Sequence, residues 1–277
     1  MTVARLLFAV LPLASIAKAQ PDLASVLKKS IANHRHDWRE AAQWRYKETD
    51  TTFKSGVKKT EVSEVVPLLG TPYSRLTGRD GRLLSGDEER REEQKYRKAR
   101  EARENEPPSE RAARISKYEN EWAFLNEIPD AYHLEPLGEE TIGGRPAWVV
   151  GITRREGFIP KAPRAAMLKH IEGKLWIDKA DLQWAKAEAQ VIETIGIGWI
   201  LARVGPGARI EMDMTRAAEN LWFPESVKIN GSAKVLMVHR RSLDEQIQYS
   251  NYVKAGEAAP KRDSPPHVTG LQAGGRN

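Results

Sequence analysis

Apolar and polar residues alternate along most of the chain after residue 43. Trp44 and Tyr46 share one face of a segment whose other face carries Arg45 and Lys47, and a period of two is typical of a strand with one buried face. The pattern recurs at regular intervals, so we expect about eleven strands in an antiparallel arrangement. The segments with this pattern include residues 43–53, 57–66, 73–79, 146–153, 173–178, 182–193, 197–204, 208–215 and 246–253.

Short glycine-containing turns separate several of these segments. Asp80-Gly81 lies between residues 73–79 and 82–84, and Asn230-Gly231 lies between residues 225–229 and 232–241. Both dipeptides favour the positive φ angles of a type I′ turn, so each predicts a tight hairpin. Gly143-Gly144 and Gly205-Pro206-Gly207 predict two further turns.

A helical period of 3.6 appears before the first strand. Leu23, Val26, Leu27 and Ile31 fall on one stripe and predict a short amphipathic helix over residues 21–33.

The strand pattern is also interrupted between residues 85 and 126. Ser85 and Glu88 have the spacing of a capping box, and residues 87–104 hold seven acidic and seven basic residues with almost nothing apolar. Such a helix is supported by pairs four residues apart rather than by burial, which is typical of a solvated spacer, although it could also dock a partner. A second helix after Pro107-Pro108-Ser109 carries the apolar stripe Ile115, Tyr118, Trp122 and Leu125.

These patterns predict a mainly β (α+β) protein. We expect a single strongly curved, unclosed antiparallel sheet, a half-barrel of about eleven strands, with helices over its concave face. The predicted domain covers residues 20–254, with a charged helical insertion at 85–126. Residues 255–277 are rich in Gly, Pro, Lys and Ser and are expected to form a disordered tail.

The first nineteen residues have the composition of a secretory signal peptide. Arg5 precedes an apolar stretch at residues 6–16, and Ala17-Lys18-Ala19 is a small-x-small cleavage site. Eleven residues cannot cross a bilayer core of about 30 Å. We therefore expect export to the bacterial periplasm, and an uncleaved interfacial anchor is the alternative. The chain has no cysteine, which excludes disulfides, a thiol nucleophile and a lipid-modified cysteine.

Motifs that carry catalysis or metal binding are missing. No G-x-S-x-G, Walker or H-E-x-x-H pattern occurs. His34, His36 and Asp37 form a short H-R-H-D cluster, which we interpret as a solvated junction between the first helix and the first strand rather than a metal site. Glu211 and Asp213 alternate with apolar residues, as on a strand with one wet face. We expect a non-enzyme without metal or cofactor, and a hydrolase is a distant alternative.

The excess of basic over acidic residues is only six in 277 and is spread along the chain, so nucleic acid is not an expected partner. The generous supply of Trp and Met instead suggests an apolar ligand. Tryptophan and methionine within strands are most often core residues, but they also line surfaces that accept varied apolar ligands. The candidate lipid-binding residues are Trp148, Trp176, Trp184, Trp199, Met212, Met214 and Trp122.

Two sequence stretches resemble the periplasmic lipoprotein-carrier superfamily, which contains LolA, LolB and RseB. The stretch Gly173-Lys-Leu-Trp-Ile-Asp178 is similar to a recurrent strand of that group, and Asn220-Leu-Trp-Phe-Pro224 is similar to the turn before its long C-terminal hairpin. The resemblance implies an unclosed curved sheet that binds acyl chains or lipoproteins and needs no cofactor. The charged insertion is much larger than the carriers' plug helices, and no arginine here matches their lid-locking arginine.

Two functions follow as hypotheses. The first is an exported periplasmic binding protein that holds a lipid or a lipidated protein in an apolar concave cavity, with only transient membrane contact. The second is an envelope scaffold or regulatory protein that docks a protein partner through its helical insertion. The sequence leaves open the ligand, the partner, the oligomeric state and the sheet face that lines the cavity.

Overall fold

A computed structural model describes residues 22–54, 56–162, 164–197, 202–235 and 239–256. The expected signal peptide (residues 1–19), Trp199 and nearly all of the expected tail lie outside the described residues. None of the helices in these ranges is long and apolar enough to cross a membrane.

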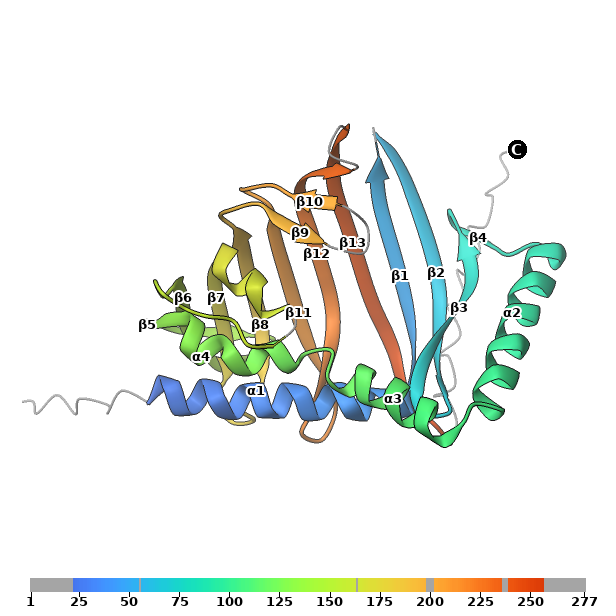
Figure 1. Cartoon of the computed structure of the whole chain (residues 1–277), viewed down its shortest axis with the longest axis horizontal. Helices are drawn as coiled ribbons and strands as arrows, with labels where there is room; N and C mark the ends of the chain where they lie inside the picture. Colours follow the sequence, from blue (N-terminus) through green and yellow to red (C-terminus); the bar gives the residue numbers. More distant parts are fainter. Residues whose placement is uncertain (1–21, 55, 163, 198–201, 236–238, 257–277) are drawn as a thin grey trace, which may run out of the picture.

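The strands form one antiparallel sheet that does not close into a barrel (Figure 1). Eleven of them are ordered β4-β3-β2-β1-β13-β12-β11-β8-β7-β6-β5, and the short strands β10 and β9 attach beside β12. The predicted fold class is therefore confirmed. The strands are β1 (Trp44–Lys54), β2 (Val57–Leu68), β3 (Thr71–Arg79), β4 (Arg82–Leu83), β5 (Tyr132–Ile142), β6 (Arg145–Arg154), β7 (Ile171–Asp178), β8 (Trp184–Val191), β9 (Ile195–Ile197), β10 (Ala202–Val204), β11 (Arg209–Ala218), β12 (Leu221–Val235) and β13 (His239–Lys254).

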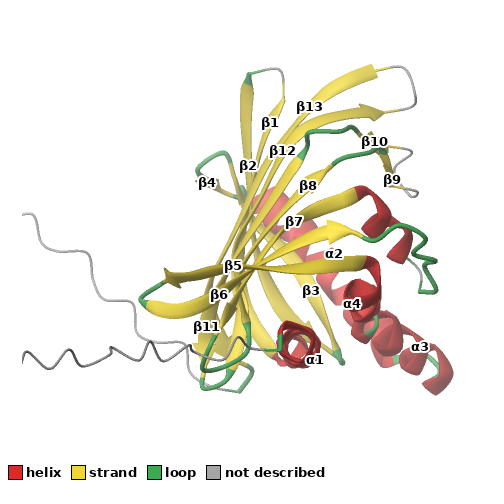
Figure 2. Cartoon of the chain, turned by 90° about the vertical axis from the view of Figure 1, so that its left-hand side faces the viewer, coloured by secondary structure: helices red, strands yellow, loops and turns green. Residues whose placement is uncertain are grey.

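Most helices lie on one side of this sheet (Figure 2). We call the face that α1 crosses the inner face and the opposite one the outer face. The long charged helix α2 instead lies beside β3, at one end of the sheet (Figure 1). The helical elements are α1 (Leu23–Glu40), η1 (Ala41–Gln43), α2 (Gly86–Glu104), α3 (Pro108–Glu119), η2 (Ala123–Glu127), α4 (Ile128–Ala131) and η3 (Ala165–His170).

The main core lies between α1 and the inner face. Leu27 and Ile31 of α1 belong to one buried core with Val150 of β6 and with Leu175 and Ile177 of β7. On β11 the residues alternate as the sequence predicts: Met212 and Met214 belong to or pack against this core, while the alternating Glu211 and Asp213 have the opposite parity. Along β11, one face is thus apolar and the other is polar.

Local signals predicted several boundaries correctly. Asp80 and Gly81 have φ angles of 49° and 79°, as a type I′ turn requires, and they join β3 to β4. The Ser85–Glu88 capping box is also present, because the Ser85 amide donates to a Glu88 carboxylate oxygen at 2.9 Å. No residue of α2 is buried, which agrees with its predicted polar surface.

The predicted hairpin at Asn230-Gly231 is wrong. Strand β12 runs without a turn from Leu221 to Val235, and Gly231 pairs with Leu243 of β13. A Cβ atom on Gly231 would lie 2.5 Å from the Cβ of Ala208, so the glycine is needed for a close approach between neighbouring segments.

Three element boundaries also differ from the prediction. The expected strand at 197–204 is instead the antiparallel pair β9 and β10. The first helix continues past residue 33 to Glu40, and α3 ends at Glu119, so that Trp122 and Leu125 follow it in a separate turn.

Candidate functional site

A pocket of about 190 Å³ opens between α1, α3 and the inner face of the sheet. Its walls come from segments far apart in the sequence, including the first, eleventh, twelfth and thirteenth strands. Aromatic and thioether side chains dominate the lining, and one carboxylate is present. The lining residues are His34, Trp38, Ala41, Tyr46, Glu48, Tyr118, Trp122, Met212, Met214, Trp222, Phe223, Pro224, Tyr249 and Tyr252.

Polar side chains of α1 fix this helix against the sheet. The buried Asp37 accepts hydrogen bonds from Gln183 Nε2 at 2.7 Å and from the Trp222 backbone N–H at 3.0 Å. About two helical turns before Asp37, the Ser30 hydroxyl accepts a hydrogen bond from Trp184 Nε1 at 3.0 Å. These buried hydrogen bonds to Asp37 Oδ2 and Ser30 fix the position of the helix, and α1 therefore forms a fixed wall of the pocket.

His34 lies at the base of the pocket among aromatic rings. Its imidazole stacks on Trp184 at 4.8 Å between centroids and meets Trp122 edge-on at 5.7 Å. Burial lowers the pKa of His34 to about 4, because an imidazolium would lose its hydration there. The ring is therefore neutral at neutral pH and behaves as an aromatic side chain.

Reciprocal contacts between Trp38 and Tyr118 hold α3 over the pocket. The two rings stack at 4.8 Å, Trp38 Nε1 donates to the Tyr118 carbonyl at 2.8 Å, and the Tyr118 hydroxyl donates to the Trp38 carbonyl at 2.7 Å. Both polar ends are used within this pair, so the ring faces remain for apolar contact.

Three tyrosines from the two ends of the chain make the opposite wall. Tyr46 of β1 lies 5.1 Å from Tyr252 and 6.0 Å from Tyr249 of β13, measured between ring centroids. Tyr252 also packs on Phe223 at 5.0 Å and donates its hydroxyl to the Pro224 carbonyl at 2.6 Å. This wall exists because β1 and β13 are paired neighbours in the sheet.

Glu48 provides the carboxylate of the pocket. It lies directly across from Tyr249 in the β1–β13 pair. Burial raises the pKa of Glu48, and the negative charges of Asp50 and Glu245 raise it further. The wall around Glu48 therefore has a negative potential within otherwise apolar surroundings.

The structure brings together three of the seven predicted ligand residues. Trp122, Met212 and Met214 all line the pocket. Trp184 is buried in the core beneath it, and Trp148 packs against the same core with the Lys179 ammonium 5.5 Å from its ring centroid. Trp176 belongs to a separate buried cluster with Ala147 and Val149, where its Nε1 donates to Glu140 at 2.8 Å.

Sequence reasoning missed Tyr46, Tyr249, Tyr252, Trp38 and Glu48. Tyr46 was recognisable as facing one side of its strand, but its partners lie about two hundred residues later in the chain, in β13. Only the pairing of the first and last strands shows that these side chains share a pocket.

The interpretation of His34 and Asp37 as part of a solvated junction is wrong, because both are buried on α1. Among the residues that the structure describes, no group of three or more His, Asp or Glu side chains could hold a metal ion.

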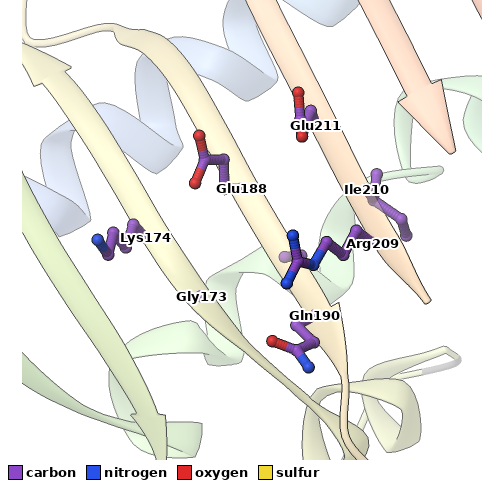
Figure 3. Close-up of a pocket in the computed structure, with 8 residues that line it drawn as sticks. Gly173, Lys174, Glu188, Gln190, Arg209, Ile210 and Glu211 are labelled. Atoms are coloured by element: carbon purple, nitrogen blue, oxygen red, sulfur yellow. The ribbon is translucent and has the colours of Figure 1, made fainter. Parts of the chain in front are cut away.

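The outer face carries a different hollow, which is shallow and charged (Figure 3). Lys174, Glu188, Gln190, Arg209 and Glu211 line it, and Lys186 pairs with Glu188 at 2.6 Å. The floor is a close approach of two strands, since a Cβ atom on Gly173 would lie 1.9 Å from the Glu188 carbonyl oxygen. Its mixed charges are typical of a solvated sheet face, and the inner pocket is the better candidate site.

No family model and no curated protein matches this sequence. A search of solved structures finds a putative outer membrane lipoprotein-sorting protein domain from Vibrio parahaemolyticus, with 11% identity, a TM-score of 0.37 and coverage of 84% of this chain and 94% of that one. A LolA superfamily protein from Nitrosomonas europaea has 12% identity, a TM-score of 0.34 and coverage of 86% and 94%.

The Pseudomonas aeruginosa MucA/MucB complex is also found, with 11% identity, a TM-score of 0.23 and coverage of 81% and 94%. These structures include the superfamily that the sequence resembles. Since every TM-score lies below 0.5, we draw the functional inferences from the residues of this chain.

Proposed function

We propose that this protein is a non-catalytic periplasmic binding protein that holds the apolar chain of a lipid or of a lipidated protein. The observation that carries the proposal is the aromatic and methionine-rich pocket between α1, α3 and the inner face. Apolar lining with few polar groups is the usual chemistry of small-molecule sites. Methionine side chains adapt to ligands of varied shape, which suits an acyl chain.

The size of the pocket limits what enters it. A dry cavity of about 150 Å³ is enough for a benzene-sized ligand, so the volume of about 190 Å³ admits only part of an acyl chain. The rest of the acyl chain must lie elsewhere on the inner face of the sheet. Half-buried apolar residues lie on the same face of the sheet as Met212, on its own strand and in register on neighbouring strands. They are Ile210, Val227, Ile229 and Ile247.

Location in the periplasm rests on the signal peptide expected at residues 1–19. The competing function, in which the insertion docks an envelope protein, would use α2. The contacts of α2 with β3 instead favour a structural role for this helix, because Arg75 donates to Glu93 at 2.7 Å and Arg103 donates to the Leu68 carbonyl at 2.7 Å.

A fluorescent fatty-acyl probe, titrated into the delipidated protein, tests the proposal. Ala41 lines the pocket, whereas the neighbouring Ala42 is similarly half-exposed and is not a lining residue. We expect Ala41→Trp to fill the pocket and weaken probe binding at least tenfold. Ala42→Trp is the matched control and should bind as the wild type does.

Mass spectrometry of lipids extracted from the native protein completes the test. A co-purified acyl lipid that competes with the probe would support the proposal. Folded, delipidated wild-type protein that fails to bind the probe saturably would contradict it, as would equal binding by both variants.

A further inference from the structure

Glu48 is the only carboxylate among the described residues that line the pocket, and no lysine or arginine is among them. His34 contributes no positive charge at neutral pH. Burial raises the pKa of Glu48, and the neighbouring carboxylates of Asp50 and Glu245 raise it further. The pocket therefore combines an apolar interior with a negative charge in its wall.

Tyrosine rings surround this charge. Tyr249 lies opposite Glu48 in the strand pair, and Tyr46 lies two residues before it on the same face of β1. The ring of Tyr46 lies 6.0 Å from the ring of Tyr249 and 5.1 Å from the ring of Tyr252, measured between centroids. The electron-rich faces of such rings attract organic cations placed within about 6 Å of their centroids.

A quaternary ammonium group fits this combination better than other head groups. It has no N–H to satisfy, so it does not need the additional hydrogen-bond acceptors that a primary ammonium would need in a dry pocket. Aromatic rings are the usual partners of quaternary ammonium ligands. An anionic head group would instead meet the Glu48 carboxylate, and no lysine or arginine is among the described residues that line the pocket.

We propose that the pocket binds an amphiphile with a quaternary ammonium head group, with the cation beside Glu48, Tyr46 and Tyr249 and the apolar chain against Met212, Met214 and Trp122. This inference rests on the proposed function and specifies its ligand class. It differs from simple acyl binding in one measurable respect, since the charge of the head group must change the affinity.

Three detergents with the same decyl chain separate the two contributions. The full-length protein is delipidated and titrated below the critical micelle concentrations with decyltrimethylammonium, decyl maltoside and decyl sulfate, and heat is measured by calorimetry. We expect the cationic detergent to bind at least tenfold more tightly than the uncharged one, and the sulfate to bind most weakly.

Glu48→Gln should lower the affinity for decyltrimethylammonium at least tenfold more than it lowers the affinity for decyl maltoside. Glu211→Gln, on the outer face, is the matched control and should change neither affinity. Tyr249→Leu tests the ring independently and should reduce the preference for the cation if Glu48→Gln proves unstable.

Equal binding of the three detergents by the wild type would overturn the inference, as would an unchanged preference in both Glu48→Gln and Tyr249→Leu. In either case, saturable binding of decyl maltoside would leave the proposed function intact. Failure of all three detergents to bind the folded protein would contradict the proposed function itself.

Discussion

At the residue scale, burial shifts the pKa values of two α1 side chains in opposite directions. Burial lowers the pKa of His34 to about 4 and raises the pKa of Asp37 to about 7. The hydrogen bonds that Asp37 accepts from Trp222 and Gln183 oppose the effect of burial without cancelling it. Between pH 4 and 6.5 the folded state binds fewer protons at His34 than the unfolded state does, and more at Asp37, so their effects on stability oppose each other.

Replacing Asp37 with asparagine isolates one of these effects. The amide can accept the same two hydrogen bonds but cannot ionise. In the wild type, ionisation of Asp37 costs stability as the pH rises from about 4 through about 7, because the folded-state pKa is the higher one. We therefore expect the stability of Asp37→Asn relative to the wild type to increase from pH 4 to pH 8.

Urea unfolding at several pH values measures this difference. His34→Phe serves as the comparison, since it should remove the opposite trend between pH 4 and 6.5. A difference between Asp37→Asn and the wild type that does not change with pH would show that Asp37 keeps an ordinary pKa.

The sequence could not reveal the burial of these two residues. His34 and Asp37 continue the stripe of Leu27 and Ile31 at helical spacing, but polar side chains in such positions look like the end of an amphipathic helix. The groups that hydrogen-bond to Asp37 and allow its burial are distant in the sequence, because Gln183 and Trp222 lie 146 and 185 residues after it.

At the element scale, α2 lies beside β3, near one edge of the sheet (Figure 1). Strand β3 pairs with β2 along its length, but on its other side it pairs with β4 through only two residues. An exposed strand edge can pair with another molecule, and proteins commonly cover such an edge. Here the side chains of α2 contact β3, with Tyr96 5.5 Å from Tyr73 between ring centroids.

Arg103 anchors the end of this helix. Its guanidinium donates to the carbonyls of Leu68 and Thr71 at 2.7 and 3.1 Å, whereas Arg100 on the same helix forms an exposed pair with Glu104. We expect Arg103→Ala to lower the free energy of unfolding by about 1–3 kcal/mol, since charged hydrogen bonds to carbonyls of buried residues are lost. Arg100→Ala should change the free energy of unfolding much less, because its ion pair is exposed to solvent.

Thermal and urea unfolding of the two variants provide the measurement. Equal stabilities for Arg103→Ala and Arg100→Ala would mean that the end of α2 is not held by the β2–β3 turn.

Local signals predicted the elements better than their pairing. The turn at Asp80-Gly81 depends on the φ angles of its own two residues, so its sequence was sufficient to predict it. Asn230-Gly231 has the same local signal, but β12 is paired on both sides with β11 and β13, and the continuous ladder overrides the turn preference. Strand content is therefore visible in the sequence, while register depends on distant partners.

At the scale of the whole molecule, the two ends of the domain meet in the centre of the sheet. Strands β1 and β13 are neighbours, and the candidate pocket includes Tyr46 from the first strand and Tyr249 from the last. The sequence predicted an open, curved sheet with an apolar face, but it could not place this central pairing. It therefore identified the methionines of the pocket and missed its tyrosine wall.

An open sheet has two free edges, and in this molecule different structural features lie along each of them. On the β5 edge, glutamates such as Glu135 and Glu139 are exposed, and the register shifts between Pro136 and Gly138. Exposed charges, proline and bulges all discourage pairing with another strand. The β3 edge has α2 beside it, so we predict that the charged helix limits pairing of this edge with another molecule.

Replacing residues 86–104 with a flexible Gly/Ser linker tests this role. The helix of 19 residues is about 28 Å long at 1.5 Å per residue, and a linker of about twelve residues can reach up to ~40 Å. We expect concentration-dependent self-association in sedimentation velocity, because β3 loses its cover. Binding of the acyl probe by the remaining monomer should be unchanged, since no residue of α2 lines the pocket.

The double variant Glu93→Ala/Arg103→Ala keeps the helix but loses two of its contacts with the sheet and should associate to an intermediate degree. A linker variant that stays monomeric at every concentration would show that the β3 edge needs no cover, and α2 would then be free to serve as the docking helix of the competing function.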